Sequence, residues 1–362
     1  MSKAWIWVGL VGLTFRVFAA DEWPEFRGAT GQGISDARNV PLTWSASNHV
    51  TWKTPLTGNG WSSPVLHNGR LYITAATGEG SELSLRARCY NARNGKLFWD
   101  KEALKGAPGS AHKKNSQASP TPIVSGNRLY LHFGHNGSAC MDLSGKLVWT
   151  NQTVKYSPVH GNGGSPALVD DLMVFNVDGA SDPFIVALDK KTGAVRWKVK
   201  RESDAQRKFS FSTPLVIDVK GQKQIISVGS GVVCALNSKD GQEFWRARFT
   251  EGYSVVPRPV FGHGLIFIST SFDRPVVLAI RPDGQGDVTE THVAWKVPKG
   301  APSTPSPLLA GDELYFVSDS GIANCVDAKT GKVHWSERIG GGYSASPVLA
   351  EGRVYFQNEE GT

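Results

Sequence analysis

Ten polar and aromatic residues stand just ahead of apolar runs, in short segments of the kind that contact ligands. Indole, phenol, imidazole, amide and hydroxyl groups combine flat apolar faces with hydrogen-bond donors and acceptors, which is the usual composition of a binding site. In the alternative interpretation, serine and glycine only satisfy turn geometry there, and the histidines hydrogen-bond to neighbouring loops. The candidate binding residues are Trp61, Ser62, His112, Asn115, His160, Asn162, Phe211, Tyr253, Arg258 and Tyr343.

The common catalytic and metal-binding patterns are missing from the sequence. The nine histidines form no His-Glu-x-x-His motif, and no Gly-x-Ser-x-Gly motif presents a nucleophilic serine. The glycine-rich run 161–164 resembles a phosphate-binding loop, but no helix is expected after it to face the phosphate. We therefore predict no catalytic residue and no metal ligand, and a binding surface becomes the main functional hypothesis.

Seven tryptophans divide the chain at nearly equal intervals, with successive gaps of 47, 50, 48, 48, 50 and 40 residues. Five of them follow a turn glycine by four residues, as in LDKKTGAVRW and VDAKTGKVHW. Self-similarity at this period indicates a propeller or solenoid, because one unit cannot bury its own apolar face. The tryptophans are Trp52, Trp99, Trp149, Trp197, Trp245, Trp295 and Trp335.

Each repeat unit combines four short strands. A proline opens an apolar run, and a second run follows after a short polar turn such as residues 67–69. A third strand, an Asp/Asn-x-x-x-Gly turn and a fourth strand that ends on the tryptophan complete the unit. Four antiparallel strands at this period describe one blade of an all-β propeller. The units begin at Pro64, Pro122, Pro166, Pro214, Pro259, Pro307 and Pro347.

The repeat is incomplete at both ends of the chain. Trp52 ends a fourth strand with no first three strands before it, and the unit that begins at Pro347 has only two strands. Since closing the ring leaves no sheet edge exposed, we expect the Trp52 strand to pair with the blade that contains Tyr355. The sequence therefore predicts six full units and a partial seventh, in a ring cut short at its C-terminus.

The first residues have the features of a secretory signal. Lys3 gives a basic start, residues 4–13 are mostly apolar, and small residues precede an expected cleavage after Ala19. We therefore expect a signal peptide at 1–19, an N-terminal extension at 20–49 and the propeller at 50–362, in a periplasmic or secreted protein. No later segment has eighteen unbroken apolar residues, so we expect no transmembrane segment in the mature chain.

The four cysteines lie on the third strands of different units, 9 to 11 residues before a tryptophan. Equivalent strands of neighbouring blades are too far apart for a disulfide, which tolerates a Cα separation of about 7 Å. We therefore expect four free thiols that act as small buried hydrophobes. They are Cys89, Cys140, Cys234 and Cys325.

The formal charge of +7 is modest and scattered along the chain. Its densest cluster lies in the connection between two units, where we expect the side chains to be solvated. Nucleic-acid binding needs a coherent basic face, so we expect no nucleic-acid partner. We also expect the protein to be a monomer. The cluster consists of Lys198, Lys200, Arg201, Arg207 and Lys208.

The phrases VALDKKTGAVRW and NCVDAKTGKVHW resemble the repeat of the pyrroloquinoline quinone (PQQ)-like β-propeller family. The N-terminal WPEFRGATGQGIS and VTWKTPL are similar to an exported bacterial branch of that family. The resemblance implies a ring of eight blades, and it implies that the seven tryptophans dock between adjacent blades.

The same resemblance leaves two kinds of function open. Quinoprotein dehydrogenases of this superfamily bind PQQ with a calcium or lanthanide ion and carry a disulfide between adjacent cysteines, whereas this chain has no adjacent cysteines. The chain also resembles distantly the assembly-factor propeller of the outer-membrane β-barrel insertion machinery, although it lacks that propeller's usual lipid-bearing cysteine. We therefore expect an exported, non-catalytic binding or scaffold propeller without a cofactor, which contacts an envelope protein or ligand at its channel mouth. A PQQ-dependent dehydrogenase and a saccharide-binding propeller are the alternatives.

Overall fold

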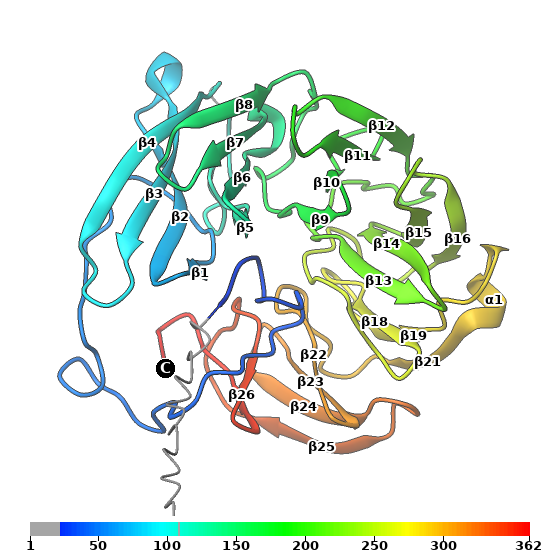
Figure 1. Cartoon of the computed structure of the whole chain (residues 1–362). Helices are drawn as coiled ribbons and strands as arrows, with labels where there is room; N and C mark the ends of the chain where they lie inside the picture. Colours follow the sequence, from blue (N-terminus) through cyan, green and yellow to red (C-terminus); the bar gives the residue numbers. More distant parts are fainter. Residues whose placement is uncertain (1–21, 108) are drawn as a thin grey trace, which may run out of the picture.

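The structure is a computed structural model that describes residues 22–107 and 109–362. Short β-sheets follow one another around a central channel, and each sheet runs outward from the channel to the rim (Figure 1). The predicted all-β propeller of four-stranded antiparallel units is confirmed, whereas the total number of blades in a closed ring stays a prediction. The expected signal peptide at 1–19 lies outside the described residues.

The described residues form seven sheets of consecutive strands, except that β20 joins the fourth sheet rather than the fifth. The first three sheets contain β1 (Val65–His67), β2 (Arg70–Thr77), β3 (Ser84–Asn91) and β4 (Leu97–Lys105); β5 (Ile123–Ser125), β6 (Arg128–His132), β7 (Ser138–Asp142) and β8 (Leu147–Asn151); and β9 (Ala167–Val169), β10 (Leu172–Val177), β11 (Phe184–Asp189) and β12 (Val195–Lys200). The fourth contains β13 (Leu215–Val219), β14 (Gln222–Gly229), β15 (Val232–Asn237), β16 (Glu243–Arg248) and the later β20 (Gly286–Asp287). The last three contain β17 (Val260–Gly262), β18 (Leu265–Ser269), β19 (Val277–Ile280) and β21 (Val293–Val297); β22 (Leu308–Ala310), β23 (Glu313–Val317), β24 (Ile322–Asp327) and β25 (Val333–Arg338); and β26 (Val348–Ala350) with β27 (Arg353–Tyr355).

Every innermost strand begins at the residue directly after one of the seven predicted prolines. Proline has no N–H and a fixed φ, so it suits the entry to a strand but not its interior. Short 3-10 turns at Gly80–Glu82 and Gly134–Asn136 and one short helix, α1 (Thr289–His292), are the only helical elements of the described residues. None of them has the length and apolar character needed to cross a bilayer.

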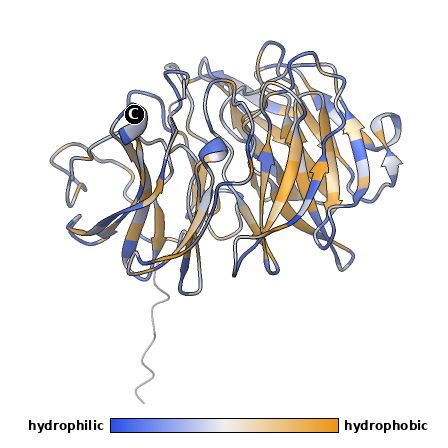
Figure 2. Ribbon diagram, turned by 90° about the horizontal axis from the view of Figure 1, so that it is seen from above, coloured by the Kyte–Doolittle hydropathy of each residue, from blue (hydrophilic) through white to orange (hydrophobic). Residues whose placement is uncertain are grey.

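The hydrophobic core lies between neighbouring sheets rather than inside one of them (Figure 2). In β15, Val233 and Ala235 face the fifth sheet, and the alternate residues Cys234 and Leu236 face the third. Successive side chains of a strand point to opposite faces, so a strand packed on both sides must be apolar throughout. This explains the unbroken apolar runs in the sequence.

The third strands carry one small residue between two large ones. Cys89, for example, lies opposite Tyr72 of β2 and opposite Trp99 of β4, and the two rings meet with centroids 6.0 Å apart. Cys140 and Cys325 occupy the same position in their sheets, and alanine occupies it in the other three complete sheets. Cys234 lies one residue away, on the other face of its strand. All four thiols are free and buried.

The tryptophans of successive sheets contact the turn of the next sheet along the chain. Trp149 donates its indole N–H to the Lys190 carbonyl at 2.9 Å, and the glycine of that turn, Gly193, lies on the indole face. A Cβ at Gly193 would come within 2.4 Å of the ring, and its φ of +73° also favours glycine. Trp52, Trp99, Trp197 and Trp295 make the same bond, each to the residue directly after a third strand. The turn glycine of the repeat is therefore needed for packing as well as for its φ.

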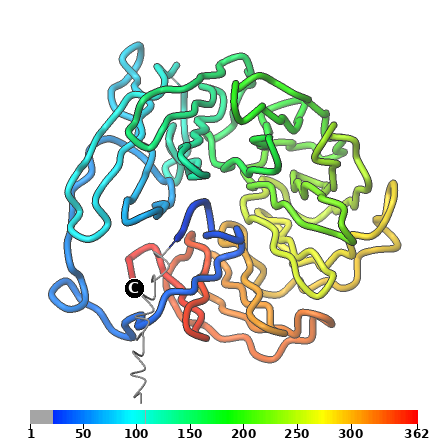
Figure 3. The backbone as a smooth tube through the Cα atoms, viewed as in Figure 1, coloured from blue at the N-terminus to red at the C-terminus, as the bar shows by residue number. Residues whose placement is uncertain are grey.

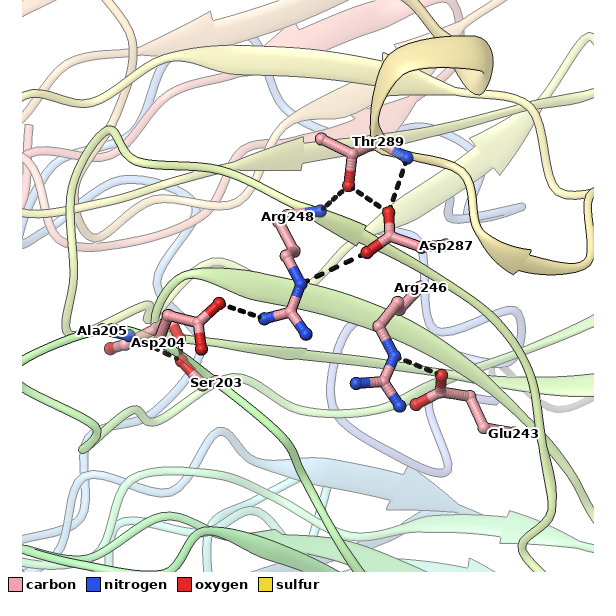
Figure 4. Close-up of polar contacts among 9 residues, drawn as sticks. Ser203, Asp204, Ala205, Glu243, Arg246, Arg248, Asp287 and Thr289 are labelled. Atoms are coloured by element: carbon pink, nitrogen blue, oxygen red, sulfur yellow. Dashed lines mark hydrogen bonds and ion pairs between the residues drawn. The ribbon is translucent and has the colours of Figure 1, made fainter.

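Trp245 departs from this pattern because of an insertion in the fifth sheet. Residues 281–292 replace the usual turn there, and the Trp245 N–H is donated to Gln224 of its own sheet at 3.1 Å. The insertion is attached to β16 through Arg248, whose backbone N–H is donated to Thr289 and whose guanidinium contacts Asp287 and Asp204 (Figure 4). These contacts fix the extra strand β20 alongside β16.

The N-terminal extension runs through the central region of the ring before it passes to the rim (Figure 3). We call residues 23–35 the plug, because they contact the innermost strands of four sheets. Trp23 forms an antiparallel bridge with Leu66 of β1. The Pro24 carbonyl accepts a hydrogen bond from the Val124 N–H of β5, and the Gln32 side-chain oxygen accepts one from the Phe261 N–H of β17. Residues 33–35 then pair with Leu349 of β26. The plug thereby joins sheets that are far apart in the sequence.

The expected pairing of the Trp52 strand with the last sheet is not observed. Among the described residues, no strand includes Trp52, and β27 has a neighbour only on its β26 side. The Trp52 indole N–H donates instead to the Ala92 carbonyl of the first sheet at 3.0 Å, and this bond holds the segment against that sheet. Trp44, rather than Trp52, lies beside Tyr355, with ring centroids 6.4 Å apart.

Candidate functional site

The mouth of the channel is organised by a series of hydroxyl groups. The residue before the strand-opening proline is serine or threonine in six of the seven units, and Arg258 takes this place in the fifth sheet. We call these groups the hydroxyl ring, because five of the six accept the backbone N–H of the corresponding residue in the preceding sheet. The bonds run from Ser63 to Thr121, Thr121 to Ser165, Ser165 to Thr213, Arg258 to Ser306 and Ser306 to Ser346, at 2.9 to 3.0 Å.

Arg258 uses its side chain to hold the plug instead of continuing the ring. The buried guanidinium donates to the Glu25 carboxylate at 3.2 Å and to the Phe26 carbonyl at 2.5 Å. Burial raises the pKa of Glu25, and the nearby Arg258 acts in the opposite direction. Burial, together with the charge of Arg258, lowers the pKa of Arg27 to about 9. Arg258 is therefore a structural residue of the plug and does not face the open mouth.

Tight backbone packing surrounds these two arginines. A Cβ on Gly31 would come within 2.6 Å of the Arg258 guanidinium, and one on Gly33 within 2.5 Å of the Arg27 guanidinium. Both glycines also have positive φ angles, so the plug sequence GATGQG admits no ordinary side chain at these two places. The plug is thus built for this position in the channel.

Five aromatic side chains lie edge to face around one side of the mouth, and we call them the aromatic arc. Successive ring centroids are 5.8, 5.3, 6.0 and 5.4 Å apart, which is the preferred spacing of aromatic pairs. Phe272 is 55% exposed, and both histidines are exposed as well. The arc consists of His112, His160, Phe209, Tyr253 and Phe272, from segments that precede β5, β9, β13 and β17 and one that follows β18.

The arc is held by hydrogen bonds between neighbouring loops. His160 accepts from the His112 backbone N–H at 3.0 Å and from the Asn115 side chain at 2.9 Å, both at its carbonyl. Tyr253 exchanges two backbone bonds of 3.1 Å with Phe272, and the Arg207 guanidinium lies 4.8 Å from the centre of the Tyr253 ring. Because backbone bonds fix the loops, the ring faces are positioned before any partner arrives.

An ion pair crosses the mouth beside the arc. Lys114, in the segment before β5, contacts Glu359, which follows β27, and Ser344 hydrogen-bonds to the same carboxylate at 2.5 Å. The hydrogen bond from Lys114 is the main cause that lowers the pKa of Glu359. This bridge connects the second sheet to the seventh across the opening.

The ten predicted binding residues separate into exposed and buried groups. Trp61 is 64% exposed, and His112 and His160 are exposed in the arc. Asn162 and Tyr343 are buried, and Tyr343 packs on Val317 and Ala323 of the sixth sheet. The partly exposed residues are Ser62, Asn115, Phe211 and Tyr253. Three of the ten, including Arg258, are therefore structural rather than surface residues.

Behind the mouth lies a small polar cavity with room for about one water molecule. Its walls include Asn162, Phe211 and the buried carboxyl of Asp178. Burial raises the pKa of Asp178 to about 6, although its partner Arg201 acts in the opposite direction. Arg201 also contacts Ser227, and it is buried. The expectation that Arg201 is a solvated charge is therefore wrong, because the side chain turns inward to pair with Asp178.

Sequence reasoning missed three residues of this region. Phe272 completes the aromatic arc and Arg207 lies over its Tyr253 ring, but no motif marks either residue, since these contacts join different sheets. Glu25 was overlooked because the N-terminal extension carries no repeat signal. The recurring Ser/Thr-Pro dipeptide is the one signal in the sequence that reveals the hydroxyl ring and the exception at Arg258.

Comparisons with known proteins place this architecture in a family. The profile described as outer membrane protein assembly factor BamB matches residues 35–153, 84–322 and 287–362. Together these matches cover most of the chain, so the protein belongs to this family of PQQ-like repeat propellers. The predicted family is thus confirmed.

Individual relatives include both an enzyme and an assembly factor. The lanthanide-dependent methanol dehydrogenase of Methylorubrum extorquens is 30% identical over 154 residues, which are 38% of this chain and 24% of that protein. BamB of Legionella pneumophila is 25% identical over 202 residues, or 54% of this chain and 48% of that protein. The chain thus spans less than half the length of these two relatives.

The solved structure of BamB from Moraxella catarrhalis has a similar fold. The TM-score is 0.62 at 16% identity, and the alignment covers 86% of this chain and 84% of the other. At this level of identity the likeness shows the fold alone.

The residues of this mouth do not fit PQQ with a metal ion. Among the described residues, no three histidine, cysteine, aspartate or glutamate side chains lie close enough to hold a metal. The one buried carboxyl at the mouth-side cavity, Asp178, is already paired with Arg201, and the cavity has room for about one water molecule. A planar three-ring quinone and its ion have no place there.

Proposed function

We propose that this chain is an exported, non-catalytic binding or scaffold propeller, which contacts a protein or ligand of the cell envelope through the aromatic arc. The observation that carries the proposal is the unbroken edge-to-face contact of five exposed or partly exposed rings on loops fixed by backbone hydrogen bonds. Rigid aromatic side chains bury large apolar areas with little loss of conformational entropy, and they often dominate binding energies.

The interior of the molecule supports a role in binding rather than in chemistry. The plug lies in the channel centre, and two pairs of charged residues next to the mouth are engaged with each other, Asp178 with Arg201 and Lys114 with Glu359. The family profile carries the name of an outer membrane protein assembly factor, and one relative has the same name. The segment 1–19 supports export, and we assign the seven tryptophans a purely structural role between blades.

The experiment uses the purified protein as bait in a detergent extract of the native cell envelope. Recovered proteins are quantified for the wild type and for a Tyr253→Ala, Phe272→Ala double variant. Because truncating a central aromatic residue costs about 2 kcal/mol or more, recovery of a specific partner should fall by more than tenfold.

A matched control separates the arc from general surface effects. Phe98 is 49% exposed on the outer strand β4, far from the mouth, and Phe98→Ala should retain the partner. Circular dichroism and the melting temperature show that each variant is folded. Equal recovery by the folded double variant and the wild type would place the binding surface elsewhere and refute the proposal.

A further inference from the structure

The charged side chains beside the aromatic arc are mostly positive. The loop segments that carry the arc are residues 109–119, 152–165, 202–212, 250–258 and 270–275. They contain seven lysines and arginines but only four carboxylates. Two of the cations, Lys114 and Arg258, pair with Glu359 and Glu25. The other five have no ion pair within the described part of the chain, and they are Lys113, Lys155, Arg207, Lys208 and Arg274.

The carboxylates of the same segments do not balance this charge, because three of the four already pair with cations from outside the segments. The pairs are Glu202 with Lys200, Asp204 with Arg248 and Glu251 with Lys296. Only Asp273 has no ion pair among residues 22–107 and 109–362. The surplus of positive charge complements an acidic partner and would steer it toward the mouth.

Unpaired cations lie at both ends of the arc. Lys113 follows His112 at one end, and it is exposed. Arg274, also exposed, lies two residues after Phe272 at the other end. Arg207 stacks on the fourth ring of the arc, 4.8 Å from its centre, and donates to its hydroxyl group. A ligand that lies along the arc therefore meets a cation near each of its ends.

The rings are spaced like the side chains of an extended peptide. Successive centroids are 5.3 to 6.0 Å apart, and alternate side chains on one face of an extended strand are about 6.6 Å apart. The plug lies in the centre of the channel, and the cavity behind the mouth has room for about one water molecule. The mouth therefore suits a segment of chain that lies across it rather than a small molecule enclosed in a pocket.

The contacts between the rings disfavour flat ligands. The four interplanar angles lie between 76° and 85°, so the edge of one ring covers part of the face of its neighbour. Arg207 covers the Tyr253 ring in addition. A flat ring, such as a nucleobase, needs an open aromatic face for stacking, whereas apolar side chains of a peptide also pack against ring edges. The arc therefore favours a peptide over a saccharide or a nucleic acid.

We propose that the aromatic arc binds an acidic, extended segment of a partner protein. Apolar side chains at alternate positions in the middle of this segment pack on Phe209, Tyr253 and Phe272. Carboxylates toward its two ends reach Lys113 on one side and Arg274 on the other. The inference rests on the proposed function, since it names the chemistry of the partner that the arc contacts.

The probe is a random synthetic peptide library on beads, in which acidic, basic, polar and apolar residues are equally frequent. The purified whole chain carries an affinity tag for detection, and the peptides on the beads that retain it are sequenced. Asp and Glu should be enriched at least about threefold over Lys and Arg, and apolar residues should recur at alternate positions. Binding of a retained peptide should weaken severalfold when the salt rises from about 0.05 to about 0.3 M, because salt screens exposed charges.

A charge-reversal variant gives the sharpest test. The Arg207→Glu, Arg274→Glu variant should bind a retained acidic peptide about tenfold more weakly and should select basic peptides from the library. Arg274→Glu alone, which keeps the contact of Arg207 with Tyr253, should weaken binding about threefold.

The matched control is Lys191→Glu, Lys239→Glu. These exposed lysines lie in the turns after β11 and β15, at the other end of the sheets from the mouth, and their reversal changes the net charge by the same amount. The control should select the same acidic peptides as the wild type. Circular dichroism and the melting temperature show that each variant is folded.

The proposal would be overturned by the absence of any retained peptide, by selection of neutral or basic peptides by the wild type, or by unchanged selection by the folded charge-reversal variant. Binding of saccharides from a glycan array in place of peptides would also overturn it. Neutral apolar peptides that are lost in Tyr253→Ala, Phe272→Ala would remove the acidic partner but leave the arc as the binding surface. Failure of the proposed function is seen separately, as equal recovery of envelope proteins by that double variant and the wild type.

Discussion

The Arg258→Met variant is expected to loosen the plug from the channel. In the wild type, the Glu25 carboxylate accepts a hydrogen bond from Arg258 at 3.2 Å. Methionine keeps most of the buried volume but leaves this carboxylate without a cation. Removing one partner of a buried ion pair costs about 3 to 5 kcal/mol. Because the variant also relieves the repulsion between Arg258 and Arg27, we expect the lower end of this range, about 3 kcal/mol.

The assay is hydrogen exchange of residues 23–35, with the innermost strands as an internal reference. A loss of about 3 kcal/mol corresponds to a rise in the exchange rate of more than about 100-fold, since each 1.4 kcal/mol is tenfold. The control is Arg248→Met, because Arg248 is a surface residue that pairs with Asp204 and Asp287, and such pairs contribute about 1 kcal/mol or less.

The pH dependence follows from Glu25. Burial already raises its pKa, and removing Arg258 takes away the influence that lowers it. A carboxyl whose folded pKa lies above the unfolded one binds more protons in the folded state, so stability falls as the pH rises through the folded pKa. The deficit of the variant should therefore be largest at neutral pH and shrink as the pH falls toward the unfolded pKa of glutamate.

A second substitution separates the charge from the packing. In the Arg258→Met, Glu25→Gln double variant the uncompensated Glu25 carboxylate is gone, so most of the lost protection should return and the pH dependence due to Glu25 should disappear. Exchange at 23–35 that is as slow in Arg258→Met as in the wild type at neutral pH would refute the reasoning, because Arg258 would then not hold the plug.

Three further predictions concern the thiols, the tryptophans and the cofactor. Alkylation under denaturing, non-reducing conditions should modify all four cysteines. The native protein should react slowly, because burial raises the pKa of Cys89, Cys140 and Cys234 to about 11. Modification of two or fewer thiols in the denatured protein would show a disulfide. Chemical denaturation should show that Trp245→Ala lowers the free energy of unfolding by about 3 to 5 kcal/mol and Trp335→Ala by less than about 2 kcal/mol, because Trp245 is buried and Trp335 is partly exposed. Equal losses of stability would contradict this difference between the two indoles. Addition of PQQ with calcium or a lanthanide ion should produce no dye reduction with common alcohols, and turnover of about 1 per second or more would restore the dehydrogenase alternative.

The sequence by itself determined the repeating parts of this protein. A strand pairs with its neighbour after a short turn, so the proline, the two apolar runs, the Asp/Asn-x-x-x-Gly turn and the tryptophan are all visible within one unit of the chain. The strand after Pro122 and the fourth strand at Trp149 therefore lie where the spacing predicts. The small residue between Tyr130 and Trp149 is explained by the same local register.

Only the tertiary structure decided which residues meet in the centre of the ring. His112 and Phe272 belong to one aromatic arc, and Arg258 meets Glu25 more than two hundred residues away. Such contacts depend on how the sheets are stacked around the channel, which no local spacing encodes. The plug lacks the repeat, so its sequence gave no sign that it enters the channel. For this reason Arg258 and Tyr343, which resemble ligand-binding residues in the sequence, are buried supports of the fold.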